Sequence, residues 1–168
     1  MVILLDPAAT VAALLPALAA NGAPVLLRGQ GTPLDGGRRF IDGRPLLGKG
    51  KTYEGLLAGF TAGAALAYLV SAVAGNPLYM VLGALSSLGA LIGDIIGAFV
   101  KRRLGLPRGA PAPILDQLDF YSGAILALLA AGYAVDPVST ALGAPVVVLL
   151  HRATNMAAHR LGLKNVPW

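Results

Sequence analysis

The chain has 168 residues, a net charge of +5 and no cysteine; 56% of its residues are hydrophobic and only 12% are charged. Soluble domains usually carry about 25% charged residues and disordered chains carry more, so this composition excludes both classes. The absence of cysteine excludes a disulfide framework, a thiol nucleophile and a Cys-ligated zinc site.

The hydrophobic residues gather into segments that suit membrane-spanning helices. A helix that crosses a bilayer needs about 20 mostly apolar residues. The fifth segment in the chain is the shortest, but it can extend past Arg152, whose long side chain can reach the interface. We expect an all-α, polytopic membrane bundle of about five transmembrane helices, which forms a single transmembrane domain over residues 1–168. In chain order the predicted spans are residues 7–27, 56–74, 77–100, 118–133 and 138–151.

The basic residues predict how the bundle is oriented. All 13 Lys and Arg fall in a loop at 28–55, a loop at 101–117 and a tail at 152–168. The remaining connections are short and carry only Asp6 and Asp136. The first span is not expected to be a signal peptide, because no basic residue precedes it. The positive-inside rule then places both loops and the C-terminal tail in the cytosol and the N-terminus outside.

The first loop contains the glycine- and lysine-rich segment Gly48-Lys49-Gly50-Lys51-Thr52. Glycines let backbone amides approach a phosphate closely, and lysines neutralise its charge. The segment is not a Walker A loop, because Pro45 stands where that motif needs glycine. It is either a phosphate-binding segment or a solvated basic loop that only sets the topology.

Asp94 is a carboxylate within the third predicted span. Placing an Asp at the centre of a bilayer costs about 2.5–3.5 kcal/mol, so it should face a partner side chain, a metal ion or a wet cavity. The alternative is a structural ion pair, and Lys101 lies on nearly the same helix face. Gly89, Gly93 and Gly97 recur every four residues on this helix and predict a face packed closely against a neighbour.

Two further carboxylates, Asp116 and Asp119, begin the fourth span and share one helix face. They are either charges that stabilise a helix N-terminus or ligands of a divalent metal ion. With Asp94 at a similar depth, three carboxylates can converge, and we expect them to hold Mg²⁺. His151 and His159 lack the spacing of a zinc site, and nothing in the chain is typical of a nucleic-acid-binding element.

Three segments together resemble the membrane phosphatidate cytidylyltransferases. Lys51-Thr52-Tyr53-Glu54-Gly55 resembles their Asn-Lys-Thr-Trp-Glu-Gly segment, and Gly93-Asp94 with Lys101-Arg102 resembles their Gly-Asp and Lys-Arg pairs. Ile114-Leu115-Asp116-Gln117-Leu118-Asp119 resembles their Ile-Leu-Asp-Arg-Leu-Asp segment. The likeness covers roughly residues 35–122. The short build with about five spans is most similar to the archaeal branch, the CDP-archaeol synthases.

The chain departs from the pattern of the wider family at three places. Gln117 replaces the Arg between the two aspartates, Pro107-Arg108 replaces Lys-Asp, and residues 109–113 replace Pro-Gly-His-Gly-Gly. No family role is carried over to these positions.

The resemblance implies transfer of CMP from CTP to a geranylgeranyl diether of glycerol phosphate at the cytosolic face of the cell membrane, giving CDP-archaeol and pyrophosphate. It leaves a homodimer open and implies no nucleic-acid partner. The expected site residues are Asp94, Lys101 and Asp119 for catalysis, Asp94, Asp116 and Asp119 for Mg²⁺, and Lys49, Gly50, Lys51, Thr52, Glu54 and Arg102 for the nucleotide.

Three alternatives fit less well. A small ion-coupled transporter or channel subunit using Asp94 would need polar groups on the outer side too. A CDP-alcohol phosphotransferase would need Asp-Gly and Ala-Arg after its aspartates, whereas residues 120–123 read Phe-Tyr-Ser-Gly. A purely structural subunit would leave the basic loop at 28–55 unexplained.

Overall fold

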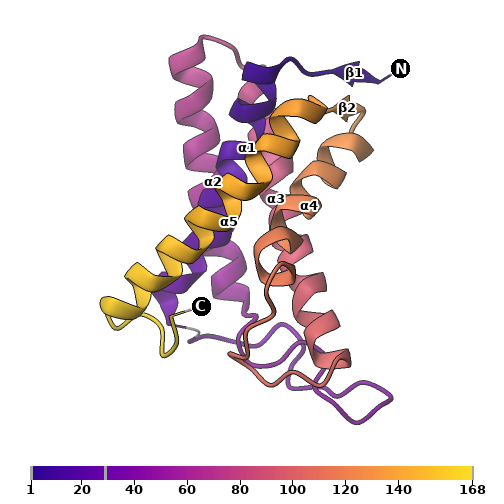
Figure 1. Ribbon diagram of the computed structural model, residues 1–168, viewed down its shortest axis with the longest axis vertical. Helices are drawn as coiled ribbons and strands as arrows, with labels where there is room; N and C mark the ends of the chain where they lie inside the picture. The colour runs from indigo at the N-terminus through magenta and orange to yellow at the C-terminus, as the bar shows by residue number, and fades with distance from the viewer. Residues whose placement is uncertain (1, 29, 168) are drawn as a thin grey trace.

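The computed structural model describes residues 2–28 and 30–167, and almost all of its regular structure is helical. Figure 1 shows helices arranged along one long axis, with two long loops gathered at one end. In chain order the elements are β1 (Ile3–Leu4), α1 (Pro7–Gly22), the 3-10 helix η1 (Ala23–Leu27), α2 (Tyr53–Ala74), α3 (Leu78–Arg103), α4 (Leu115–Ala130), β2 (Tyr133–Ala134) and α5 (Pro137–Arg160).

Side-chain caps fix where three of the helices begin. Asp6 accepts a hydrogen bond from Ala9 N–H at 2.7 Å, Thr52 from Gly55 N–H at 3.0 Å, and Asp136 from Ser139 N–H at 2.7 Å. Such N-terminal caps satisfy amides that have no partner within the helix.

Most helix boundaries differ from the predicted spans by a few residues, and the start of α4 and the end of α5 show the reason. Helix α5 continues to Arg160 instead of ending at residue 151, so the first part of the predicted tail 152–168 is helical. Helix α4 begins at Leu115 instead of residue 118. Both differences arise because charged residues end an apolar segment but do not end a helix.

Small residues line the faces along which the helices meet. Helix α3 contacts α1, α2 and α4, and α5 packs against α1 and α4. Ala13, Ala17 and Ala20 of α1 are completely buried. A Cβ on Gly89 would overlap with Ala127 of α4, so the predicted close-packing face of α3 is confirmed. Small side chains allow the backbones to approach closely, which is how helices gain contact in a membrane.

Large apolar side chains cover the outside of the bundle. Val73 is 90% exposed, Leu57 68% and Ile96 56%, which no water-soluble monomer tolerates over whole helices. Three helical segments of the described chain are long and apolar enough to cross a membrane, and they are Pro7–Leu27, Tyr53–Ala74 and Leu78–Arg103. The prediction of a helical membrane protein is therefore supported, while the count of about five spans stays a prediction.

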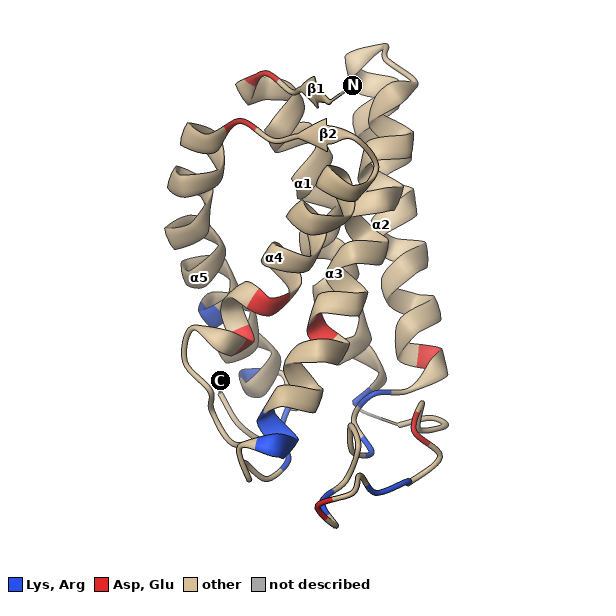
Figure 2. Cartoon of the chain, turned by 90° about the vertical axis from the view of Figure 1, so that its right-hand side faces the viewer, with Lys and Arg blue, Asp and Glu red and all other residues tan. Residues whose placement is uncertain are grey.

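The two ends of the molecule differ in charge. Figure 2 shows the Lys and Arg residues clustered at the end that carries the loops, with acidic segments of α3 and α4 just inside it. At the opposite end β1 pairs in parallel with β2, with Ile3 beside Tyr133. The sequence did not predict these strands, because two residues carry no periodic pattern. They tie the N-terminal segment to the connection between α4 and α5.

Candidate active site

Lys51 and Asp94 lie at the centre of the candidate site. The Lys51 ammonium donates a hydrogen bond to the Asp94 carboxylate and forms an ion pair with it. Both side chains are about three-quarters buried, being 24% and 28% exposed. The alternative of an Asp–Lys pair at Asp94 is therefore met, but by Lys51 from the loop before α2; Lys101, which lies on nearly the same helix face as Asp94, pairs with Asp116. The contact joins loop 28–55 to the interior of α3.

Backbone pairing holds Lys51 in position. Leu34 N–H donates to Lys51 C=O at 2.8 Å, and Tyr53 N–H donates to Thr32 C=O at 3.0 Å. Thr52 is 4% exposed, and its hydroxyl caps α2. This hydroxyl, predicted to contact the nucleotide, therefore also fixes the end of the loop.

Lys101 and Asp116 form a second ion pair, at 2.5 Å. The other oxygen of Asp116 accepts a hydrogen bond from Ala112 N–H at 2.9 Å. Asp116 therefore connects the last turn of α3 with the loop that leads into α4. Its carboxylate is already engaged by these two donors.

Asp119 lies one helical turn further into α4, half-buried against α3. Its carboxylate abuts Gly97, where a Cβ would come within 2.8 Å of the Asp119 carboxyl carbon. It accepts a hydrogen bond from Phe120 N–H at 2.6 Å. It also lies within electrostatic range of Asp94, Lys51 and Lys101. Two carboxylates from neighbouring helices thus share one small charged region.

The predicted three-carboxylate metal site is only partly assembled. Among residues 2–28 and 30–167, no group of three Asp, Glu or His side chains is close enough to hold a metal ion. Asp94 and Asp119 are the pair near each other, while Asp116 contacts Lys101. Magnesium is usually held by one or two carboxylates plus substrate phosphates and water, so this donor set fits it.

Asp35 organises the glycine-rich part of the loop. Its carboxylate is 6% exposed and accepts hydrogen bonds from Gly37, Leu47 and Gly48 N–H, each at 2.9 Å. Burial acts to raise the pKa of Asp35, but these backbone donors outweigh burial and hold the pKa below its ordinary value. Gly48 has a φ of +91°, a conformation that favours glycine.

Two arginines of the second loop region lie beside this glycine-rich segment. Arg102 is 8% exposed, and its Nη1 lies 3.7 Å from where a Cβ on Gly48 would stand. Its buried Nε has no hydrogen-bond partner among the described residues. Arg108 Nε lies 3.2 Å from the Cβ position of Gly50. The sequence assigned no role to Arg108, because the wider family has a different residue type there.

A third arginine fixes the first loop to α3. The guanidinium carbon of Arg103 lies 4.7 Å from the ring centroid of Phe40 and 5.0 Å from that of Phe99, and the two rings contact each other edge to face with centroids 5.4 Å apart. It also donates to Asp42 at 2.5 Å and to Pro45 C=O. These contacts hold residues 40–45 over the end of α3.

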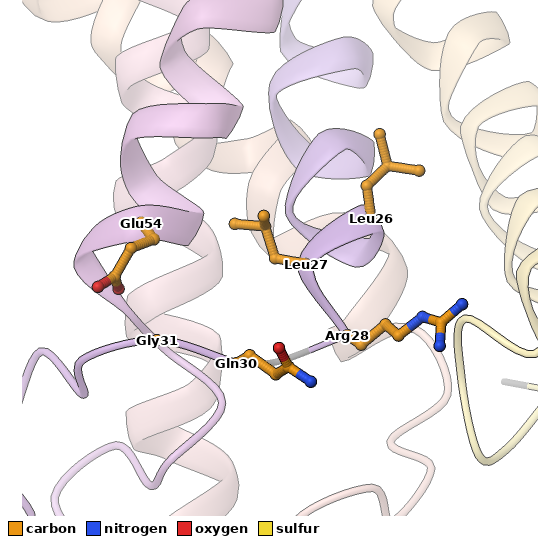
Figure 3. Close-up of a pocket in the computed structure, with 6 residues that line it drawn as sticks. All are labelled: Leu26, Leu27, Arg28, Gln30, Gly31 and Glu54. Atoms are coloured by element: carbon orange, nitrogen blue, oxygen red, sulfur yellow. The ribbon is translucent and has the colours of Figure 1, made fainter.

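Glu54, predicted to contact the nucleotide, hydrogen-bonds to the start of its own loop. Its carboxylate accepts hydrogen bonds from Thr32 N–H at 2.7 Å and from the Thr32 hydroxyl at 3.0 Å. Figure 3 shows Glu54 on the first turn of α2 beside Gly31, at the rim of a pocket of about 510 Å³, with Arg28 pointing away. Lys49 and Gly50 are exposed on the loop surface.

An apolar groove of about 560 Å³ runs between α3 and α4. Asp119 and Ser122 are the polar side chains in its lining, which otherwise consists of glycine and apolar residues such as Ile92, Ile96 and Leu126. The groove therefore leads from the outer apolar surface to the carboxylate of Asp119.

The polar end of α5 faces the same region, which the sequence did not indicate. The ring of His151 stacks on Phe120 with the centroids 6.2 Å apart. Asn155, 6% exposed, contacts His151 and accepts a hydrogen bond from Lys164 at 2.9 Å.

Taken together, ammonium and guanidinium groups surround two carboxylates, Asp94 and Asp119, at the mouth of an apolar groove. Such an arrangement can bind a polyanion next to a lipid.

Comparisons with known proteins agree with this chemistry. A family model described as CarS-like, CDP-archaeol synthase, matches residues 1–168. The CDP-archaeol synthase of Hyperthermus butylicus is 60% identical over 165 residues, covering 98% of both chains. That of Aeropyrum pernix is 53% identical over 155 residues, covering 92% of this chain and 88% of the relative. A solved structure, described as an intramembrane enzyme for archaeal membrane lipids biosynthesis, matches with a TM-score of 0.83. It is 49% identical and covers 92% of this chain and 96% of the other.

Proposed function

Because the chain belongs to the CDP-archaeol synthase family, we propose that it transfers CMP from CTP to a geranylgeranyl diether of glycerol phosphate. The products are CDP-archaeol and pyrophosphate. The chain is then a cytidylyltransferase of archaeal phospholipid synthesis. The comparisons give no support to the transporter alternative.

The observation that carries this proposal is the ion pair between Lys51 and Asp94. It brings a loop rich in glycine and cations onto a carboxylate inside an apolar helix. One substrate is a water-soluble polyanion and the other is a lipid, so their reaction requires such a boundary. The groove between α3 and α4 supports the same reading, because its apolar walls suit prenyl chains and it ends at Asp119.

In the proposed reaction an oxygen of the lipid phosphate attacks the α-phosphorus of CTP in line. A new P–O bond forms, and the bond from the α-phosphorus to the oxygen bridging to the β-phosphorus breaks, so pyrophosphate leaves with the electron pair. The attacking phosphate is already anionic, so no side chain has to remove a proton. Lys51, Lys101 and Arg102 offset the repulsion between the two anions and the charge that develops on the leaving group. Gly48 and Gly50 let the loop approach the phosphates closely, beside Lys49 and Arg108.

The carboxylates Asp94 and Asp119 would hold Mg²⁺, with Asp116 as the third predicted ligand. When bound, the ion supplies positive charge that offsets the phosphate charge and orients the triphosphate. Asp116 also holds Lys101 in place through their ion pair. Glu54 and Thr52 act on the nucleotide through the shape of the loop, since their side chains hydrogen-bond to its backbone.

We further propose that the chain crosses the cell membrane about five times, with the N-terminus outside and the site on the cytosolic side. The clustering of Lys and Arg at one end of the bundle supports this orientation. Helices α4 and α5 would supply the fourth and fifth spans. Loop 28–55, loop 101–117 and the tail 152–168 would then belong to the cytosolic face of one domain.

The test is an assay with the purified, detergent-solubilised protein. Radiolabelled CTP, Mg²⁺ and the geranylgeranyl diether of glycerol phosphate are mixed, and label is counted in the lipid phase. We expect transfer with CTP, little with ATP, and none after EDTA unless Mg²⁺ is restored. If the folded protein transfers no label to this lipid, the proposed function is wrong. If transfer survives EDTA, the assignment of Mg²⁺ is wrong.

A further inference from the structure

The chain reverses direction after α5 and returns toward the bundle, as Figure 1 shows. Gly162 makes the turn with a φ of +69°, which favours glycine. Leu163 and Lys164 N–H then donate to Ala158 C=O at 2.8 Å and 3.3 Å. The ring of His159 contacts Lys164 C=O at 3.0 Å. The backbone at Lys164 is therefore held against the last turns of α5.

A short chain of polar contacts aims the Lys164 side chain inward. Its ammonium donates to Asn155 Oδ1 at 2.9 Å, and Asn155 Nδ2 lies 3.2 Å from His151 Nδ1. Asn155 is 6% exposed, so its amide is held by packing as well as by these contacts. The His151 ring rests on Phe120, the residue that follows Asp119. His151, Asn155 and Lys164 thus form a series of contacts that packs against α4, the helix that carries Asp119.

Charges from three other parts of the chain act on Lys164. Burial is the main cause that lowers the pKa of Lys164; Asp116 acts to raise it, and Lys101 and Lys51 act to lower it further. A half-buried lysine near two other lysines and one carboxylate is placed where an anion would be most favourable. Lys51 comes from the first loop and Lys101 from α3, so Lys164 adds a cation from the opposite, α5 side.

On the basis of the proposed function, we propose that Lys164 is a further phosphate-binding residue of this site, delivered by the C-terminal tail and positioned by Asn155. The ligand chemistry is a phosphate oxygen, which belongs either to the triphosphate of CTP or to the lipid phosphate. Asn155 is a positioning residue, because it acts through Lys164.

The first test compares four full-length single variants, and one double variant that combines two of them, in the transferase assay. Lys164→Met removes the charge and keeps the length, Lys164→Arg keeps the charge, and Asn155→Ala removes the positioning amide. Arg160→Ala is the matched control, because it removes one exposed cation from the end of the same helix. KM is measured separately for CTP and for the lipid phosphate, together with kcat and thermal stability.

We expect Lys164→Met to raise the KM of one of the two substrates about tenfold or more, as loss of a charge-assisted hydrogen bond does. The substrate whose KM changes identifies the phosphate. Lys164→Arg should restore most of the affinity, and Asn155→Ala combined with Lys164→Met should add little to Lys164→Met alone. Unchanged KM values for both substrates in folded Lys164→Met would overturn the proposal, and so would a loss of thermal stability alone.

The second test needs no variant. Lysine acylation of the native protein is followed by mass spectrometry at Lys164, with CTP, pyrophosphate, the lipid phosphate or phosphate-free cytidine present. We expect protection by a phosphate-bearing ligand and none by cytidine. Equal labelling in every arm would refute the proposal. This readout does not require turnover, so an inactive protein that still shows protection would count against the proposed function alone.

Discussion

Lys51 and Asp94 form an ion pair although 43 positions separate them in sequence. Lys51 belongs to a glycine-rich loop and Asp94 to the middle of an apolar helix. Breaking a largely buried pair by removing one charge leaves the other uncompensated. The pair therefore links the placement of the loop to the chemistry of the helix, and a substrate phosphate would have to share Lys51 with Asp94.

The aspartates are the first residues to test. We expect Asp94→Asn and Asp119→Asn to lower kcat at least a hundredfold, because each removes a charge that acts on the reacting phosphates. Both variants should remain folded as judged by gel filtration, with some loss of thermal stability in Asp94→Asn because Lys51 loses its partner. Asp6→Asn is the control, since Asn caps a helix as well as Asp and Asp6 lies at the other end of the bundle. Near-normal turnover in both site variants would contradict their assignment as metal ligands.

Substitutions at two glycines of α3 distinguish an effect on helix packing from an effect on activity. A Cβ at Gly97 would collide with the Asp119 carboxylate, whereas a Cβ at Gly89 would collide with Ala127 and the α4 backbone. We expect Gly97→Ala to reduce activity strongly, and Gly89→Ala to reduce thermal stability more than it reduces kcat per folded molecule. Gly22→Ala is the control, because no atom lies within 4 Å of its new methyl group. Equal behaviour of all three variants would show that the contact with Asp119 has no special role.

Thr52 distinguishes a helix cap from a nucleotide ligand. Its hydroxyl accepts the Gly55 N–H bond at 3.0 Å, so Thr52→Ala should destabilise the protein by about 1 kcal/mol and Thr52→Ser should be nearly neutral. Because the cap also positions Lys51, we expect Thr52→Ala to raise the KM for CTP. A rise in KM without any loss of stability would instead indicate direct contact with the nucleotide.

Protonation of Asp35 should determine how the loop at 28–55 responds to acid. Its pKa is lower in the folded chain than in the unfolded chain, where an Asp titrates near 3.9. The carboxylate therefore stabilises the loop fully above the unfolded pKa, and this stabilisation is lost as the pH falls through the lower folded pKa. Proteolysis of residues 36–50 should accelerate over that acidic range. Asp35→Asn should show fast cleavage at neutral pH with no acid step, and an unchanged profile in this variant would contradict the role of Asp35.

Much of the scaffold could be predicted because membrane helices follow simple local rules. Apolar segment length located all five helices within a few residues, except where α5 continues through charged positions to Arg160. The recurrence of Gly89, Gly93 and Gly97 predicted a packing face, and α4 occupies it. These features depend on residues close together in sequence.

The sequence predicted which residues belong to the site better than it predicted which of them contact one another. Asp94 was expected to face a partner side chain, a metal ion or a wet cavity, and Lys51 rather than the neighbouring Lys101 is its partner, because the fold of the loop decides which lysine reaches it. That fold depends on the hydrogen bonds that Asp35 accepts and on the contact of Arg103 with two phenylalanine rings, and no local pattern reveals these contacts. The sequence did not indicate a role for Lys164 for the same reason, since the position of Lys164 depends on the chain reversal at Gly162.

The orientation of the bundle can be measured directly, because the chain has no native cysteine to remove. Val2 is 65% exposed, Ile41 94% and Leu161 71%, and each can be replaced singly by cysteine. In intact cells a membrane-impermeant maleimide should label Val2→Cys and leave Ile41→Cys and Leu161→Cys unlabelled until the membrane is permeabilised.

An N-terminus and a C-terminus on opposite sides of the membrane require an odd number of crossings, which five spans supply. Labelling of Leu161→Cys from outside, with Val2→Cys also labelled, would require an even number and would remove either α4 or α5 from the set of spans. Labelling of Ile41→Cys from outside would reverse the side on which the basic loop and the ion pair of Lys51 with Asp94 lie.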